Sequence, residues 1–181
     1  LYYAFSVLAS GIARDLDAPR AAVVGAFSAA LLAQGATALL AGPLIDRIGA
    51  RRAMTVGSLA AGIGLAFASQ VASLWQLYLA WAALGAVMAF TLYEAAFTAV
   101  TAAFGAGAAR RGIAAVTLVA GFASTVSWPL VGVLEASEGW RSTLLLLALA
   151  NAACALPHGL VLAGPVGTVA RTGLVCAAVL A

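Results

Sequence analysis

The chain has 181 residues, of which 65% are hydrophobic and 8% are charged, and its mean hydropathy is +1.09. A soluble domain of this length could not bury so much apolar surface, so the composition indicates a protein of the lipid bilayer. The net charge of +3 comes from arginines and acids without a long run of like charge, which argues against nucleic acid as a partner.

Charged residues separate the chain into long apolar runs, and each run is predicted to be a membrane-spanning helix. About 20 helical residues cross roughly 30 Å of hydrocarbon, and runs this long exclude barrel strands. The predicted spans are residues 1–13, 21–45, 53–74, 75–104, 112–134 and 141–163. We therefore expect an all-α membrane protein, with one six-helix bundle over residues 1–163. Residues 164–181 are either a linker or the start of a further span.

The first run is short for a span and begins at Leu1, so the true amino terminus is expected to be missing. No cleavable signal peptide is recognised there. Tyr3, Ser6 and Ser10 fall on one helical face of this run. We interpret this face, and Tyr3 in particular, as a candidate lining of a cavity.

The connection after the second span is the densest cluster of positive charge. Because it has no side chain, Gly42 would let two helix ends approach closely. Asp46 could interact with the positive amino-terminal end of another helix. The arginines could pair with carboxylates or lipid headgroups. The candidate motif residues are Gly42, Asp46, Arg47, Gly49, Arg51 and Arg52. The alternative is a basic loop that only sets the topology.

The fourth span carries the acidic residue Glu94 well inside an apolar run. A lone buried carboxylate is costly unless it is paired, protonated or hydrated. Thr91, Glu94, Thr98 and Thr101 share one stripe of a continuous helix, which predicts a polar cavity lining. Glu94 is either a ligand-contacting or proton-titrating group, or it is protonated and hydrogen-bonded for packing.

The last two spans give weaker signals. Thr117, Gly121 and Thr125 form a small polar stripe interrupted by Trp128, which is favoured as close helix packing and kept as a candidate for the cavity. His158 and Asn151 are interpreted as incidental or structural. The two cysteines, Cys154 and Cys176, are interpreted as small hydrophobic residues. No metal site, disulfide or cofactor is predicted.

Arginine placement predicts the orientation. Six arginines follow the second, fourth and sixth spans and three follow the others, so the first set, including loop 46–52, is expected in the cytoplasm. Gly42, Leu44, Gly49 and Arg51 also recur ninety positions later as Gly132, Leu134, Gly139 and Arg141. Because one copy is cytoplasmic and the other external, the bundle would consist of two inverted three-helix repeats.

The pattern Gly-x-x-x-Asp-Arg-x-Gly-x-Arg-Arg over residues 42–52 resembles the loop between the second and third helices of the major facilitator superfamily. The resemblance covers residues 1–163 and implies the amino-terminal half of a twelve-helix fold, in which this loop is a conformational latch. Residues 92–97, 110–114 and 138–141 are similar to bacterial members near the monocarboxylate and oxalate/formate porters. Trp81 stands where many proton-driven members have arginine.

The resemblance implies a secondary active transporter in a bacterial inner membrane, working by alternating access on a small solute, with a small organic anion as the leading substrate hypothesis. Its partners would be the bilayer, the substrate and a missing carboxy-terminal six-helix half, in the same chain or in a second copy. No nucleophile, metalloprotease or phosphate-loop motif is present, so an enzyme is not expected. The alternative is a non-transporting six-helix membrane protein or a degenerate remnant.

Overall fold

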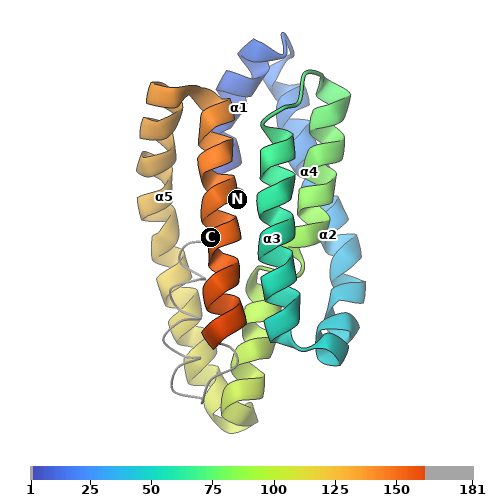
Figure 1. Cartoon of the computed structure of the whole chain (residues 1–181), viewed down its shortest axis with the longest axis vertical. Helices are drawn as coiled ribbons and strands as arrows, with labels where there is room; N and C mark the ends of the chain where they lie inside the picture. Colours follow the sequence, from blue (N-terminus) through green and yellow to red (C-terminus); the bar gives the residue numbers. More distant parts are fainter. Residues whose placement is uncertain (1, 162–181) are drawn as a thin grey trace.

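The computed structural model describes residues 2–161, and these residues contain helices and no strand. The helices are α1 (Tyr2–Asp15), α2 (Arg20–Ile48), α3 (Ala50–Ala68), α4 (Leu74–Met88) and α5 (Tyr93–Val161). They stand side by side along the long axis of the molecule (Figure 1). The expected all-α class is confirmed, while the predicted tail at 164–181 lies outside the described residues.

The longest helix, α5, is folded back on itself. A straight helix of 69 residues would be about 100 Å long, but Figure 1 shows the α5 ribbon reversing direction at both ends of the bundle. One residue within α5, Gly139, has a φ of 77°, in the left-handed region that glycine tolerates best. The segment α5 thus contains the end of the fourth predicted span together with the fifth and sixth.

The two copies of the ninety-residue repeat share this backbone feature. In the described part of the chain, the glycines with positive φ are Gly49, at 84°, and Gly139, at 77°. Gly49 separates α2 from α3, and its N–H donates to the Ile45 carbonyl at 2.8 Å. The weak sequence repeat therefore coincides with two equivalent breaks in the helical backbone.

The prediction of one continuous helix over residues 75–104 is wrong. Helix α4 ends at Met88 and α5 begins at Tyr93, and the intervening turn is closed by bonds from Phe90 N–H to the Val87 carbonyl and from Thr91 N–H to the Met88 carbonyl. The Thr91 hydroxyl also donates to the Val87 carbonyl at 3.4 Å. A threonine hydroxyl that bonds to nearby backbone offers an alternative to the helical ladder.

An aromatic cluster occupies the centre of the main core. Trp81 of α4 is fully buried, and its ring lies edge-on to Phe5 of α1 at 4.5 Å and to Phe27 of α2 at 6.3 Å between centroids. Phe5 and Phe27 stack on each other at 5.2 Å. Offset and edge-to-face pairs of this kind are favourable beyond their buried area. Trp81 is therefore a packing residue of the core.

Helices α2 and α4 cross at very short range because glycines face the partner backbone. A Cβ atom at Gly85 would overlap the carbonyl group of Ala30, and one at Gly25 would overlap the Tyr78 hydroxyl. That hydroxyl donates to the Ala22 carbonyl at 2.9 Å. Small residues allow such backbone approach in membrane helices, where apolar burial alone does not drive association.

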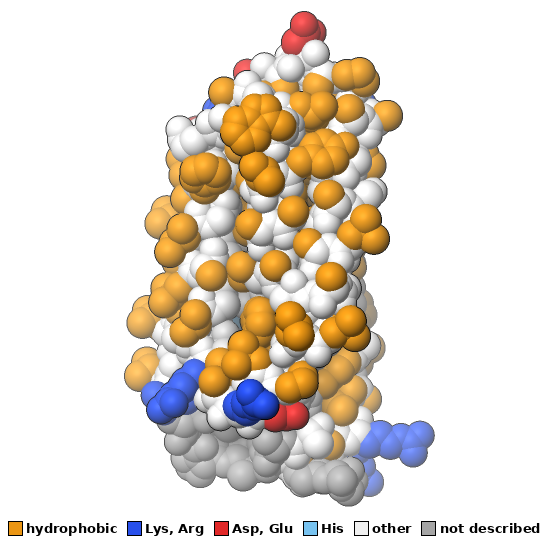
Figure 2. Space-filling view, turned by 90° about the vertical axis from the view of Figure 1, so that its right-hand side faces the viewer, with side chains coloured by type: hydrophobic (Ala, Val, Ile, Leu, Met, Phe, Trp, Pro, Cys, Tyr) orange, Lys and Arg blue, Asp and Glu red, His pale blue; other side chains and the backbone are white. Residues whose placement is uncertain are grey.

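The outer surface is apolar over most of its height. Figure 2 shows hydrophobic side chains covering one face, with acidic side chains at its top and basic ones near its bottom. Among the described residues, two helical segments are long and apolar enough to cross a membrane, Arg20–Ile48 and Ala109–Leu160, and the apolar helix Leu74–Met88 is shorter. These findings support a membrane protein.

Candidate functional site

The predicted motif loop forms the junction between α2 and α3. Ile45 of this loop and its neighbour Ala41 are each 1% exposed, and they lie in a second core cluster with Met54 of α3 and Ala95 of α5. The Ala53 N–H donates to the Gly49 carbonyl at 3.1 Å, so α3 begins directly after the break. The position of the loop is thus fixed by apolar packing.

The charged members of the loop point outward. Asp46, Arg47, Arg51 and Arg52 are exposed, and within the described part of the chain none of them has an ion pair. No described atom lies within 4 Å of a Cβ built at Gly42. The loop therefore presents an exposed carboxylate, three guanidinium groups and a glycine with free space around it at one end of the bundle.

The predicted polar stripe of the fourth span is only partly assembled. Thr91 lies in the turn before α5, is 3% exposed, and its methyl group would lie 2.5 Å from a Cβ at Gly57 of α3. It therefore packs against α3 and shares no helical stripe with Thr98, which is half-buried on α5. The side chain of Glu94 lies outside the described part of the structure, so its cavity role stays a prediction.

The polar face predicted on α1 lies opposite the buried face of that helix. Phe5, Leu8 and Ile12 are at most 2% exposed. In contrast, Tyr3 is 36% exposed, and Ser6 and Ser10 are also exposed. The Ser6 hydroxyl donates to the Tyr3 carbonyl at 2.9 Å. We call Tyr3, Ser6 and Ser10 the α1 polar stripe. In the described structure, no helix covers it.

Trp128 also lies on the outside of the bundle. It is 52% exposed within α5, next to Pro129, and exposed Thr117 and Thr125 precede it on the same helix. The Thr117 hydroxyl donates to the Ile113 carbonyl at 2.9 Å, which satisfies its donor within the helix. Because the side chains of Thr117, Thr125 and Trp128 are exposed, these three residues do not support the interpretation of the stripe as close helix packing.

One polar contact joins residues that are far apart in the chain, and the sequence gives no sign of it. Nδ1 of His158 lies 3.0 Å from the Ser58 hydroxyl, and both side chains are at most 2% exposed. Within the described residues, Nε2 of His158 has no hydrogen-bond partner. Periodicity does not indicate this contact, because Ser58 lies 100 positions before His158 in a different predicted span.

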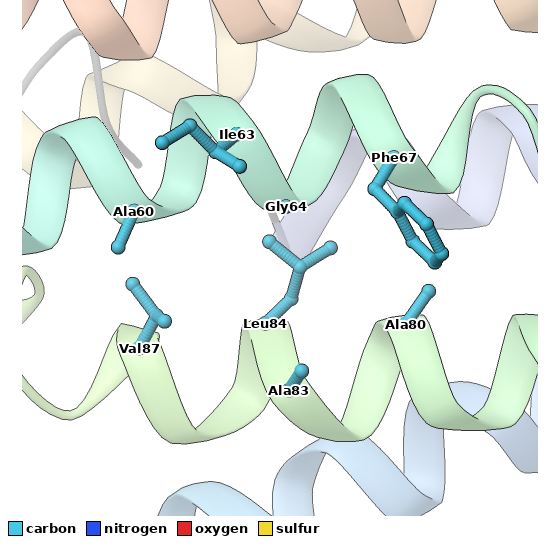
Figure 3. Close-up of a pocket in the computed structure, with 8 residues that line it drawn as sticks. All are labelled: Ala60, Ile63, Gly64, Phe67, Ala80, Ala83, Leu84 and Val87. Carbon is cyan, nitrogen blue, oxygen red and sulfur yellow. The ribbon is translucent and has the colours of Figure 1, made fainter.

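An apolar cavity of about 370 Å³ lies between α3 and α4. Figure 3 shows side chains of the two helices facing each other across it. Its lining residues are Ala60, Ile63, Gly64, Phe67, Ala80, Ala83, Leu84 and Val87. Ile63 and Phe67 are 72% and 65% exposed, so the cavity opens to the outer surface. With this lining it could accept hydrocarbon and offers nothing to bind a polar solute.

Among the described residues, no three His, Cys, Asp or Glu side chains are grouped so that they could hold a metal ion. The family model of the Major Facilitator Superfamily matches residues 1–172 of the chain. No curated protein and no solved structure matches the chain. The match includes the motif loop, the α1 polar stripe and all five described helices.

Proposed function

Because the chain belongs to the major facilitator superfamily, a family of membrane transporters, we propose that it forms the amino-terminal six-helix half of a secondary active transporter. In this proposal the turn at residues 89–92 lies within the fourth span, and α5 supplies the rest of that span together with the fifth and sixth. The solute would cross by alternating access, driven by an ion or solute gradient rather than by ATP hydrolysis.

The observation that carries the proposal is the uncovered α1 polar stripe. A helix that faced only lipid would be expected to expose apolar side chains, because polar groups in hydrocarbon are costly. On α1 the large apolar side chains Phe5, Leu8 and Ile12 face the bundle, and Tyr3, Ser6 and Ser10 face away from it. This arrangement suits a helix that lines an aqueous pathway opposite a second bundle.

The binding site of such a transporter lies near the bilayer midplane between two bundles. The second bundle would be contributed by the same polypeptide or by a second copy. We place the α2–α3 loop, residues 46–52, on the cytoplasmic side from the arginine distribution. The similarity of residues 92–97 and 138–141 to the monocarboxylate and oxalate/formate porters favours a small organic anion as substrate, in a bacterial inner membrane.

The exposed loop charges fit the role of a latch. Asp46 and the arginines have no ion pair in the described structure, while the buried neighbours Ala41 and Ile45 hold the loop in place. A carboxylate presented in this way could dock on the amino-terminal end of a helix in the second bundle. Arg47, Arg51 and Arg52 would reinforce the closed cytoplasmic side.

Substitution of Asp46 by asparagine tests the latch. The exchange keeps the side-chain size and removes the charge, and a carboxylate at a helix end contributes about 0.3–2 kcal/mol. We therefore expect initial uptake rates in proteoliposomes to change by about two- to thirtyfold. The matched control is Asp17→Asn, at the opposite end of the bundle. The backbone φ of Asp17 is 47°, and asparagine adopts a positive φ as readily as aspartate does. Equal rates for Asp46→Asn and the parent would assign the loop to topology alone.

Uptake of radiolabelled lactate, oxalate and formate by the native full-length polypeptide, reconstituted in proteoliposomes, tests the transport proposal. We expect saturable uptake of at least one of these anions under a proton gradient or in exchange for a loaded anion. Uptake of other solute classes only would overturn the substrate proposal. Absence of all solute flux from folded, inserted protein would favour the non-transporting alternative.

A further inference from the structure

One guanidinium group binds the ends of two other helices. Arg141 donates to Oδ2 of Asp15, the last residue of α1, from Nη2 at 2.7 Å and from Nε at 3.1 Å. It also donates from Nη1 to the Ser69 carbonyl at 2.7 Å and from Nη2 to the Val71 carbonyl at 2.9 Å. A single side chain of α5 therefore connects the carboxyl ends of α1 and α3.

The two residues before Arg141 direct it toward these helix ends. Gly139 takes the left-handed backbone that turns the chain. Trp140 is 6% exposed, and its ring would lie 3.4 Å from a Cβ at Gly11 of α1. The Arg141 guanidinium carbon lies 4.3 Å from the Trp140 ring centroid, a distance suited to a cation–π contact. The three consecutive residues thus turn the chain, pack on α1 and bind its end.

The chemistry of the contact requires arginine. Ser69 caps the carboxyl end of α3, where the helix dipole is negative, and Val71 lies in the segment after it, so their carbonyl groups are acceptors outside the helical ladder. A planar guanidinium can serve several such acceptors at fixed angles, whereas a lysine ammonium is a compact point charge with three donors. Arg141 uses Nε, Nη1 and Nη2 for four hydrogen bonds in this arrangement.

A second ion pair joins the same elements and is weaker. Nη2 of Arg14 lies 3.7 Å from Oε1 of Glu135, and the Arg14 side chain is 79% exposed. Exposed pairs at this distance contribute little. In the described structure the Arg141 contacts are therefore the principal polar attachment of the carboxyl end of α1. Figure 1 shows this end of α1 at the opposite end of the bundle from the α2–α3 junction.

We propose that Arg141 is a positioning residue that fixes the rotation and tilt of α1, and through α1 the direction in which Tyr3, Ser6 and Ser10 face. This inference rests on the proposed transport function for its consequence, since the α1 polar stripe would line the pathway. Ser10 lies only five residues before Asp15, so a displaced helix end would reorient it directly. Loss of Arg141 would release the carboxyl-terminal end of α1, while Phe5 keeps the start of the helix packed against Phe27 and Trp81.

Cysteine labelling tests the position of α1 without any transport. In a background with Cys154→Ala and Cys176→Ala, Ala9→Cys reports on a residue that is 1% exposed, and Ser10→Cys reports on its exposed neighbour. With Arg141 intact, a maleimide should label position 10 and spare position 9. We expect Arg141→Lys and Arg141→Ala to raise the labelling rate at position 9 at least about tenfold, since a charged hydrogen bond is worth about that factor.

Arg14→Ala is the matched control, because it removes the longer and more exposed ion pair, and it should leave labelling at position 9 unchanged. The thermal midpoint of each variant in detergent separates local release of α1 from unfolding. In the uptake assay, Arg141→Lys should lower the rate about tenfold while the thermal midpoint changes little.

An unchanged labelling rate at position 9 in both Arg141 variants would overturn the inference, whatever uptake shows. Faster labelling at position 9 in protein with an unchanged thermal midpoint supports it. If labelling increases but no variant, and no parent protein, moves any solute, then the positioning of α1 by Arg141 stands and the proposed transport function fails.

Discussion

Replacing Trp81 with alanine is expected to lower the free energy of unfolding by about 3–5 kcal/mol, the range for deleting a large buried aromatic side chain. Trp81 is fully buried and is the residue through which α4 contacts Phe5 of α1 and Phe27 of α2. Alanine would leave a cavity between three helices. Unfolding in detergent, followed by circular dichroism over a denaturant titration, gives the measurement.

Two further variants show whether the loss comes from the ring. Trp81→Phe should retain most of the stability, because it keeps an aromatic ring and the Trp81 indole N–H has no hydrogen-bond partner in the described structure. Trp75→Ala, at a position that is 64% exposed, should change the free energy of unfolding by less than about 1 kcal/mol. Equal losses for Trp81→Ala and Trp75→Ala would contradict the described core.

Substitution of Gly85 is expected to separate α2 from α4. A Cβ at this position would overlap the Ala30 carbonyl, which is backbone and cannot rotate away. Gly85→Ala should therefore cost about 1–3 kcal/mol, as overpacking does in cores, and Gly85→Leu should prevent recovery of folded protein. The measurements are the yield of monodisperse protein after size exclusion and the thermal midpoint.

The matched control for Gly85→Ala is Gly35→Ala. Gly35 lies within α2, and no described atom lies within 4 Å of a Cβ built there. Alanine is preferred over glycine in a helix interior by about 0.5–1 kcal/mol, so this variant should be as stable as the parent or more stable. A loss of stability in Gly35→Ala that matched the loss in Gly85→Ala would show that the effect does not come from the α2–α4 contact.

The helical segments were predictable because their signal is local. Hydropathy and charge alone indicate helices near 21–45 and 53–74, and the structure has α2 over Arg20–Ile48 and α3 over Ala50–Ala68. The turn at Thr91 was not predictable in this way. It depends on a threonine hydroxyl that bonds to the Val87 carbonyl and on a glycine, Gly57, that leaves room on another helix.

In the candidate site, too, some features were predictable from local sequence and others depend on contacts between helices. The α1 polar stripe could be predicted from spacing within one helix, and Tyr3, Ser6 and Ser10 are indeed exposed together. The contact between Ser58 and His158, and the bonds from Arg141 to Asp15 and Ser69, join residues about 70 to 126 positions apart. Periodicity within one helix carries no information on such pairs, because they depend on how the helices are placed in the bundle.

The ninety-residue repeat was only partly predictable from the sequence. Four matching residues at an offset of ninety gave a weak signal in a glycine-rich chain. The positive φ angles at Gly49 and Gly139 add a structural correspondence between its two copies. Beyond this break the copies differ in their contacts, since the charges after Gly49 have no ion pair in the described structure, whereas Arg141 binds two helix ends.

If this bundle is half of a secondary transporter, the reconstituted full-length polypeptide should carry a solute flux. We expect saturable, ATP-independent uptake of a small carboxylate that responds to an imposed gradient and changes in rate in Asp46→Asn. Folded and correctly inserted protein that moves no solute under any ion or solute gradient would contradict this proposal.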